Sequence, residues 1–446
     1  MTHIDFIKEE LDRVGDAAAL GFQERTVSGG ALLEEIDKNA LWLVDQGIKP
    51  GDAVVLVGDF SIDSVSLMLA LINMAAITIP VTPATLRNVE DQMDAIQPDH
   101  IIDVSGGGRT LQTLSPDGAN AHYVTIRERG LPGLVLFTSG STGKPKAVVH
   151  DYAKLLSKFR AKRSAMITLN FLLFDHWGGL NTLLHSLANG SLLVLPENRK
   201  PDDVCALIER YGIELLPATP SFLNMLLISG AADRHDLSSL KVISYGAEPM
   251  PASTLARLRE TFPDIDLRQT YGMIELGVLR AKSRDDGSLW VKLGGEGYDL
   301  RVVDDMLQIK ADAAMLGYIN HESPITEDGY FKTGDLVEQD GDYLKILGRK
   351  SDLINVGGQK VYPAEVETIL LDVPGVIDAS VYGQPHVMLG KIVCARVVVP
   401  PETDEAEMRK TIKRYCGERM QPYMVPVRIE FEPDTLQNHR LKRQRL

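Results

Sequence analysis

At 446 residues the chain is longer than one hydrophobic core usually supports, so we expect two or more domains. Asp and Glu outnumber Lys and Arg by 61 to 47, and the net charge of −14 argues against a protein that binds nucleic acid through a general basic surface. Three scattered cysteines, Cys205, Cys394 and Cys416, lack metal-ligand spacing and indicate a reducing compartment without structural zinc.

The sequence gives no sign of a membrane span. Residues 1–17 are polar and charged, so they lack the apolar region of a secretory signal peptide. The most apolar stretch, residues 65–80, is shorter than the ~20 residues that cross a bilayer, and it ends in Pro80. We therefore expect a cytoplasmic protein.

Helical and strand patterns alternate from the start of the chain. Helices are predicted over residues 32–47, 61–75 and 89–96, and strands over residues 53–57, 77–81 and 100–104. Residues 109–122 are rich in turn formers and are predicted to be a surface connection, followed by a short strand over 123–127. Alternation of this kind predicts an α/β domain with a largely parallel sheet.

A glycine- and hydroxyl-rich loop follows an apolar run at residues 134–137. Its glycines allow close approach of the backbone to a ligand, and its hydroxyl and lysine side chains supply donors and positive charge, which is typical of a phosphate cradle. A Walker A loop is a poor match, because Lys144 is followed by Pro145 and Gly140 lies only three residues before Gly143.

Several motifs resemble those of the adenylate-forming superfamily, which includes acyl-CoA synthetases, adenylation domains of nonribosomal peptide synthetases and beetle luciferases. Residues 138–146 read Thr-Ser-Gly-Ser-Thr-Gly-Lys-Pro-Lys and are similar to the family's signature loop. Residues 271–275 (Tyr-Gly-Met-Ile-Glu), 330–335 (Tyr-Phe-Lys-Thr-Gly-Asp) and 348–352 (Gly-Arg-Lys-Ser-Asp) resemble later motifs, in the family's order and spacing.

The resemblance implies a large N-terminal domain of two α/β lobes plus a small β region, followed by a small mobile α/β C-terminal domain. The patterns agree, because helices and strands alternate again over residues 204–228 and short, turn-punctuated strands fill residues 289–347. Residues 349–356 look like the family's hinge. We place the domains at 1–350 and 351–446.

The resemblance also implies a reaction. A carboxylate attacks the α-phosphate of ATP, giving acyl-AMP and pyrophosphate, and the acyl group then passes to a thiol. Both partners are anions, so positioning and charge neutralisation matter most. The implied ATP-binding residues are Thr138, Ser139, Gly140, Ser141, Thr142, Gly143 and Lys146 at the phosphates, Gly246, Ala247, Glu248, Tyr271 and Gly272 around adenine, and Asp335 and Arg349 at the ribose. Glu275 is the implied Mg²⁺ ligand.

The acid pocket can be aligned with the family's pattern in two ways. The candidates are Phe171, Asp175, His176, Trp177, Gly246 and Gly277, and two alignments compete. If His176 matches the family's histidine, the pocket suits an apolar or aryl acid. If Asp175 takes the place of the acidic residue in amino-acid adenylation domains, the substrate is an amino acid. His176 as a hydrogen-bonded core histidine is the structural alternative.

Two departures from the family's pattern bear on catalysis. Ile274 stands where the family has Thr, which removes a hydroxyl near the phosphates. In the tail, ungapped alignment puts His439 at the family's catalytic Lys and Lys442 at its Arg, while one inserted residue would offer Arg440. Losing one preorganised donor of this kind typically costs on the order of 10² to 10³ in rate.

Three functions follow. The first is an acid-thiol ligase that activates a small apolar or aromatic acid and transfers it to CoA or to a carrier-protein phosphopantetheine. The second is a stand-alone amino-acid adenylation enzyme that serves a carrier protein. The third is a nucleotide- or acyl-adenylate-binding homologue without turnover, suggested by Ile274 and His439.

Overall fold

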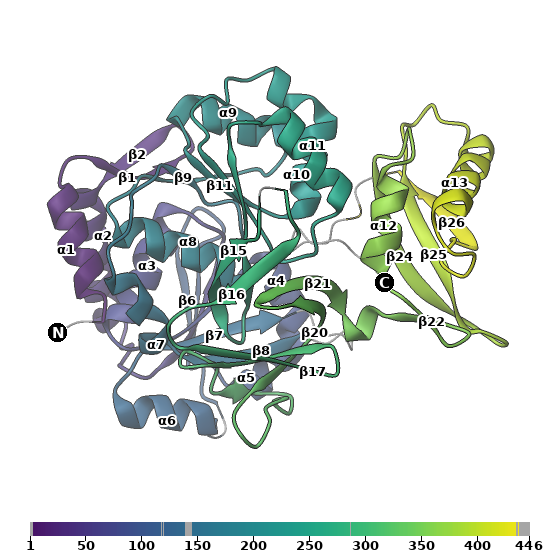
Figure 1. Cartoon of the computed structure of the whole chain (residues 1–446). Coiled ribbons are helices and arrows are strands. Elements are labelled where there is room, and N and C mark those ends of the chain that lie inside the picture. Colours follow the sequence, from purple (N-terminus) through teal and green to yellow (C-terminus); the bar gives the residue numbers. More distant parts are fainter. Residues whose placement is uncertain are drawn as a thin grey trace.

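The computed structural model describes residues 3–116, 118, 120–138, 145–285, 287–433 and 436 (Figure 1). In this part of the chain two sheets carry helices, one with a parallel centre and antiparallel edges and one mainly parallel; an antiparallel sheet lies beside them, and a smaller sheet follows near the C-terminus. The architecture is the predicted one: an α/β protein with two lobes, a β region and a small C-terminal α/β unit.

The first lobe is built on strands that are buried on both faces. Strands 53–57 and 77–81 are buried along their whole length, which explains their unbroken apolar sequences. The sheet order is β19 (Gly317–Tyr318), β8 (Lys146–Asp151), β7 (Gly133–Thr138), β4 (Ile77–Val81), β3 (Ala53–Val57), β5 (His100–Asp103) and β6 (Thr110–Thr113). The helices of this part are α1 (Asp5–Val14), α2 (Gly29–Asp45), α3 (Ile62–Asn73), α4 (Pro83–Val89), η1 (Glu90–Gln92), α5 (Met93–Ile96), α6 (Ala121–Arg129), α7 (Tyr152–Ser157) and η2 (Lys158–Arg160).

The sheet of the second lobe is parallel except at one edge strand, which pairs antiparallel with its neighbour, whereas the sheet of the first lobe has antiparallel pairs at both edges. Its sheet order is β13 (Asp266–Gln269), β12 (Val242–Tyr245), β11 (Leu215–Ala218), β9 (Thr168–Leu169), β10 (Leu193–Leu195), β1 (Ala18–Phe22) and β2 (Arg25–Ser28). The helices are α8 (Trp177–Ala188), α9 (Pro201–Tyr211), α10 (Pro220–Ser229), η3 (Ala231–Asp233) and α11 (Ala252–Thr261).

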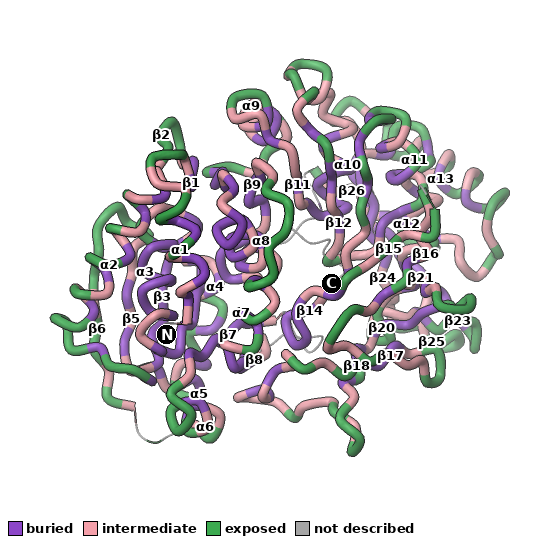
Figure 2. Tube along the Cα trace, turned by 60° about the vertical axis from the view of Figure 1, so that its left-hand side comes forward, coloured by how far each residue is buried: buried purple, intermediate pink, exposed green. Residues whose placement is uncertain are grey.

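The β region is antiparallel, as its short turn-punctuated sequence predicts. Its sheet order is β14 (Tyr271–Met273), β15 (Gly277–Ser283), β16 (Trp290–Gly294), β21 (Tyr343–Arg349), β20 (Phe331–Asp340), β18 (Met306–Ala311) and β17 (Tyr298–Val303). One hydrophobic cluster joins this region to both lobes, because Leu136, Leu193 and Leu307 all belong to it and are fully buried. Figure 2 shows α3 and α8 buried along most of their length within this shared core.

The C-terminal unit has a core of its own, which includes Val366, Val381 and Ile412. Figure 1 shows it to one side of the larger body, beside α10 and α11. Its elements are β22 (Ile354–Val356), β23 (Gln359–Val361), α12 (Pro363–Leu371), β24 (Asp378–His386), β25 (Gly390–Val398), α13 (Glu405–Arg419) and β26 (Arg428–Glu432). The predicted boundary between residues 350 and 351 falls in the short turn η4 (Lys350–Asp352) and stays a prediction.

Two local predictions were wrong. Residues 123–127 form part of helix α6 and not a strand, because Asn120 caps its first turn, Gly130 ends it in a left-handed conformation, and Tyr123 and Ile126 bury one helical face. The predicted surface connection 109–122 contains β6, an edge strand whose side chains are mostly exposed, so its sequence has no apolar pattern.

Two further predictions concern membrane-spanning helices and the three cysteines. Among the described helices, none combines the length and apolar character needed to cross a membrane. Cys205, Cys394 and Cys416 are buried and form no disulfide, and burial raises the pKa of the Cys205 thiol to about 11. They therefore resemble small apolar core residues more than nucleophiles.

Candidate active site

A cavity of about 560 Å³ lies where the two lobes and the β region meet. Strands β11 and β12 reach it at their carboxyl ends, where ligands usually bind in parallel sheets. The predicted site residues that line it are Thr138, Lys146, His176, Trp177, Gly246, Ala247, Glu248, Tyr271, Gly272, Glu275, Asp335 and Arg349. Motifs far apart in the sequence are thus brought to one place.

Asp335 is the centre of a hydrogen-bonded group in the cavity. The Tyr271 hydroxyl donates to Asp335 Oδ2 at 2.6 Å, and Arg349 Nε lies 2.8 Å from Asp335 Oδ1. Burial and the neighbouring Asp335 carboxylate raise the pKa of Tyr271 well above its usual value, so its phenol stays a donor. The same carboxylate raises the pKa of Arg349. Each carboxylate oxygen can accept a second hydrogen bond, as two ribose hydroxyls would require.

Glu275 and Lys146 meet around Tyr318. The Tyr318 hydroxyl donates to Glu275 Oε1 at 2.7 Å, and Lys146 Nζ lies 5.2 Å from the centre of the Tyr318 ring. Burial raises the pKa of Tyr318, so its hydroxyl also stays a donor. A carboxylate and an ammonium group are therefore held close together, which suits a metal-bound polyphosphate. We call this side of the cavity the carboxylate wall; it consists of Lys146, Tyr271, Glu275, Tyr318, Asp335 and Arg349.

His150 fixes the turn that carries Glu275. Its ring Nε2 lies 2.7 Å from the carbonyl oxygen of Ile274, to which it donates, and the amide of Met315 donates to the carbonyl of Glu275 at 2.8 Å. Burial lowers the pKa of His150 to about 4, so the ring is neutral near pH 7. The side chain of Ile274 lines the cavity and supplies no hydroxyl there.

A second group of lining residues is mainly apolar. Leu172, Trp177, Gly178 and Val278 line the cavity together with His176. We call these five residues the apolar wall. His176 caps α8, and its Nδ1 accepts a hydrogen bond from the amide of Gly178 at 3.1 Å, which places the proton of a neutral ring on Nε2. The apolar wall therefore presents to the cavity an apolar surface and the imidazole ring of His176, and none of its five residues carries a permanently charged side chain.

The loop after β12 shapes a third side. Ala247 has a φ of +70°, a backbone conformation that residues other than glycine rarely adopt. The backbone is therefore strained where it borders the cavity. A Cβ at Gly246 would lie 2.4 Å from Thr270 Oγ1, so the close approach of Thr270, which stands between β13 and β14, requires glycine here. Glu248 lines the cavity and accepts from the amide of Ser221 at 3.0 Å.

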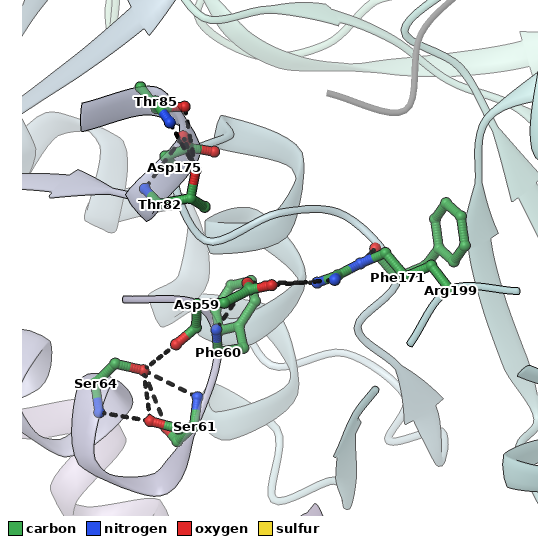
Figure 3. Close-up of polar contacts among 9 residues, drawn as sticks. All are labelled: Asp59, Phe60, Ser61, Ser64, Thr82, Thr85, Phe171, Asp175 and Arg199. Atoms are coloured by element: carbon green, nitrogen blue, oxygen red, sulfur yellow. Dashed lines mark hydrogen bonds and ion pairs between the residues drawn. The ribbon is translucent and has the colours of Figure 1, made fainter. Parts of the chain in front are cut away.

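Three predicted pocket residues do not line the cavity. The Phe171 ring packs on Phe222 in the core of the second lobe, with ring centres 4.3 Å apart. Asp175 is buried and turns towards Thr82 of the first lobe, as Figure 3 shows. Gly277 sits behind the wall, where an added Cβ would lie 3.5 Å from Trp177 Nε1. The predicted role of Asp175 as a ligand for a substrate amino group thus has no support from its position.

Some predictions lie outside the described residues. These are Ser139, Gly140, Ser141, Thr142 and Gly143 of the loop, and His439, Arg440 and Lys442 of the tail. The assignment of phosphate contacts to the loop, and of the catalytic cation to the tail, therefore stays a prediction.

Tyr318, His150 and Thr333 were not predicted. Thr333 Oγ1 accepts from the amide of Asp335 at 3.0 Å and donates to the carbonyl of Leu307 at 2.7 Å, which fixes the part of strand β20 that carries the carboxylate. Tyr318 lies on a two-residue strand, too short for a periodic signal. Of the three residues, His150 alone left a signal in the sequence. It lies in the buried strand β8, and a buried histidine ring needs a hydrogen-bond partner.

Comparison with known families gives two matches along the chain. The family described as AMP-binding enzyme matches residues 7–331, and the family described as AMP-binding enzyme C-terminal domain matches residues 365–442. The interval between the two matches contains the predicted hinge.

Curated relatives match over most of the chain. A 2-succinylbenzoate–CoA ligase of Bacillus licheniformis is 26% identical, covering 97% of this chain and 96% of its own. The 4-coumarate–CoA ligase-like 5 protein of Oryza sativa subsp. japonica is 28% identical, covering 86% of this chain and 77% of its own.

Solved structures share the fold. The anthranilate CoA ligase AuaEII in complex with anthranoyl-AMP superposes with a TM-score of 0.81 at 21% identity, covering 99% of this chain and 95% of that one. ATP-bound MatB from Rhodopseudomonas palustris gives a TM-score of 0.80 at 22% identity, covering 100% of this chain and 97% of that one.

Proposed function

Because the chain belongs to the AMP-binding enzyme family, we propose that it is an ATP-dependent acid-thiol ligase acting on a small apolar or aromatic carboxylic acid. The observation that carries the proposal is that one cavity is lined both by the carboxylate wall, with the buried carboxylates of Glu275 and Asp335 and the cations Lys146 and Arg349, and by the apolar wall. A nucleotide and an apolar acid fit these two walls.

The first step is formation of acyl-AMP. A carboxylate oxygen of the acid attacks the α-phosphorus of ATP, and the bond to pyrophosphate breaks. In this proposal Asp335 accepts hydrogen bonds from the ribose hydroxyls and Arg349 holds Asp335 in place. Lys146 offsets negative charge as the two anions approach, and the reaction is accelerated mainly by holding both reactants in line.

Magnesium fits the carboxylate wall. Mg²⁺ prefers oxygen ligands and commonly bridges phosphates with one or two protein carboxylates. Glu275 would hold it, with the Tyr318 hydroxyl fixing the orientation of that carboxylate. The ion would neutralise phosphate charge and help pyrophosphate to leave.

The second step is thiol transfer. The sulfur of CoA, or of a carrier-protein phosphopantetheine, attacks the acyl carbonyl; the carbon–sulfur bond forms, AMP leaves, and the thiol proton passes to solvent or a base. Gly357 and Gly358 would border the path of the thiol, as the resemblance implies. Both acceptors present the same arm, so the acceptor is decided by experiment.

The rival functions are weaker on this geometry. Amino-acid adenylation loses its main residue, because Asp175 contacts Thr82 and does not line the cavity. A homologue without turnover rests on Ile274 and on tail residues outside the described part of the chain.

The test is pyrophosphate release from Mg²⁺–ATP with benzoate, 4-coumarate, anthranilate, 2-succinylbenzoate, octanoate and a set of amino acids, each with and without CoA. Release with an aryl or apolar acid, followed by thioester formation when CoA is added, is expected. Release with amino acids alone would move the function to the rival, and ATP binding without release for any acid would favour the homologue without turnover.

A further inference from the structure

The stretch that carries most of the apolar wall bridges the two lobes. Residues 171–178, here called the pocket segment, run from the end of β9 to the start of α8. Within it Leu172, His176, Trp177 and Gly178 line the cavity, whereas Phe171 and Asp175 do not.

The first end of the pocket segment is held by Arg199. Arg199 Nε donates to the Phe171 carbonyl at 2.7 Å, and its Nη1 lies 3.0 Å from Asp59 Oδ2 (Figure 3). Asp59 follows β3 of the first lobe, whereas Arg199 follows β10 of the second. The Arg199 side chain is 10% exposed and that of Asp59 is 39% exposed, so the ion pair is shielded from solvent on the arginine side alone. One guanidinium thus ties the segment to the first lobe.

The second end is held by Asp175. Its Oδ2 accepts from the Thr82 hydroxyl at 3.3 Å and from the Thr82 amide at 3.4 Å, and Thr82 is the residue that caps α4 (Figure 3). Next to it the Phe174 ring packs edge-on against Phe60 of the first lobe, with ring centres 5.2 Å apart. Asp175 is 1% exposed, so its carboxylate is enclosed within the protein beside Thr82.

The pocket segment has little freedom between these ends. A Cβ at Gly179 would lie 2.2 Å from the Leu173 carbonyl oxygen, and a Cβ at Gly178 would lie 2.4 Å from Leu172 Cδ1. The turn into α8 is therefore packed against the segment itself. A shift at either end has to move Leu172 and the start of α8, and with them Trp177.

We propose that Arg199 and Asp175 are positioning residues, which fix the pocket segment to the first lobe and so set the width of the acid side of the cavity. The proposal rests on the proposed function only in calling that side the acid side. Arg199 suits this task because its rigid, planar guanidinium directs Nε to the Phe171 carbonyl and Nη1 to the Asp59 carboxylate, a fixed geometry that a single lysine nitrogen does not reproduce.

Kinetics give the first test. Using the acid identified by pyrophosphate release, Arg199→Ala and Asp175→Ala are expected to raise the KM for the acid on the order of tenfold or more, because one hydrogen bond to a charged group has about that worth. The KM for ATP stays unchanged. Arg199→Lys, which keeps the charge beside Asp59, gives an intermediate value, and Asp175→Asn, which keeps an acceptor for Thr82, recovers most of the affinity.

Ser61→Ala is the matched control. Ser61 caps α3 two residues after Asp59 and makes none of the recorded contacts with the pocket segment (Figure 3). Its loss weakens a helix start beside the same loop and tests whether general destabilisation alone raises the KM for the acid. An unchanged KM is expected. An equal rise in Ser61→Ala, or an equal rise in the KM for ATP, would overturn the positioning role.

A second readout needs no substrate. With Trp42 and Trp290 replaced by Phe, Trp177 is the remaining tryptophan of the chain, and it is 2% exposed. Acrylamide quenching of its fluorescence should rise in Arg199→Ala and Asp175→Ala and not in Ser61→Ala. Should the alanine variants fail to fold, Arg199→Lys and Asp175→Asn are compared instead.

The two proposals fail differently. If the parent chain releases no pyrophosphate with any acid, the proposed function fails, and Trp177 quenching still tests the segment. If the parent is active but the variants keep both the KM for the acid and the quenching, the positioning role is wrong. A loss confined to amino-acid substrates in Asp175→Ala would assign Asp175 to substrate recognition.

Discussion

The carboxylate wall and the apolar wall border the same cavity but are built from different contacts. On the carboxylate wall, Asp335 and Glu275 are each bonded directly to a neighbouring tyrosine hydroxyl. On the apolar wall, Trp177 is placed by a segment whose anchors, Arg199 and Asp175, lie outside the cavity. Charged groups are thus fixed by their own partners, whereas the apolar shape depends on packing elsewhere.

This difference predicts distinct responses to mutation. Changes on the carboxylate wall should lower the rate with every acid, because ATP is common to all reactions. Changes behind the apolar wall should alter the preference among acids.

Glu275→Ala should lower pyrophosphate release on the order of 10² to 10³-fold for all acids, as expected when one preorganised charged group at the reacting phosphates is lost. Circular dichroism and thermal unfolding should show a folded protein. Glu34→Ala removes an exposed carboxylate on α2 and serves as the control. A Glu275→Ala enzyme with normal turnover would remove Glu275 from the site.

Asp335→Asn should raise the KM for ATP about 10- to 100-fold, because hydrogen bonds from ribose to a charged acceptor are replaced by weaker ones. The parent should prefer ATP over 2′-deoxy-ATP, and the variant should lose most of that preference. Equal discrimination by parent and variant would show that Asp335 does not contact the ribose.

Tyr318→Phe should lower the rate about tenfold and raise the Mg²⁺ concentration needed for half-maximal activity, since the ring stays but the hydrogen bond to Glu275 is lost. Tyr318→Leu also removes the ring beside Lys146 and should be worse. If the two variants are equally impaired, the hydroxyl carries the whole effect; if Tyr318→Phe equals the parent, it carries none.

His150 should make the larger domain less stable in acid. Its pKa is lowered by burial from 6.5 to about 4, so below pH 6.5 the unfolded chain takes up a proton that the folded chain refuses. The contribution of His150 to the free energy of unfolding should be fully present above pH 6.5. It should fall by about 1.4 kcal/mol per pH unit between pH 6.5 and about pH 4. Urea unfolding across this range should show a shallower fall in His150→Gln than in the control His386→Gln, which changes an exposed histidine of the C-terminal unit.

Buried strands and charged residues within motifs could be predicted from the sequence, whereas elements with exposed side chains could not. The strands 53–57 and 77–81 are buried on both faces, so their apolar runs were readable, and charged residues within motifs such as Asp335 were found because their chemistry is local. Helix α6 was misread because only Tyr123 and Ile126 are buried in it. Edge strand β6 was missed because its side chains face solvent.

The apolar wall was harder to predict for a physical reason. Whether Asp175 or His176 meets the cavity depends on which way a turn between β9 and α8 faces, and that is decided by Thr82, about 90 residues earlier in the chain. Tyr318 likewise acquires its role only when β19 pairs with β8. Contacts of this kind leave no trace in local spacing.

If the two walls together form acyl-AMP, a single-turnover experiment without thiol should detect it. Enzyme in excess over ATP is mixed with Mg²⁺ and the best acid of the panel, quenched, and examined by mass spectrometry. Acyl-AMP and pyrophosphate are expected, with conversion to acyl-CoA and AMP after CoA is added. Formation of acyl phosphate and ADP, or no product from an acid and ATP that both bind, would contradict this expectation.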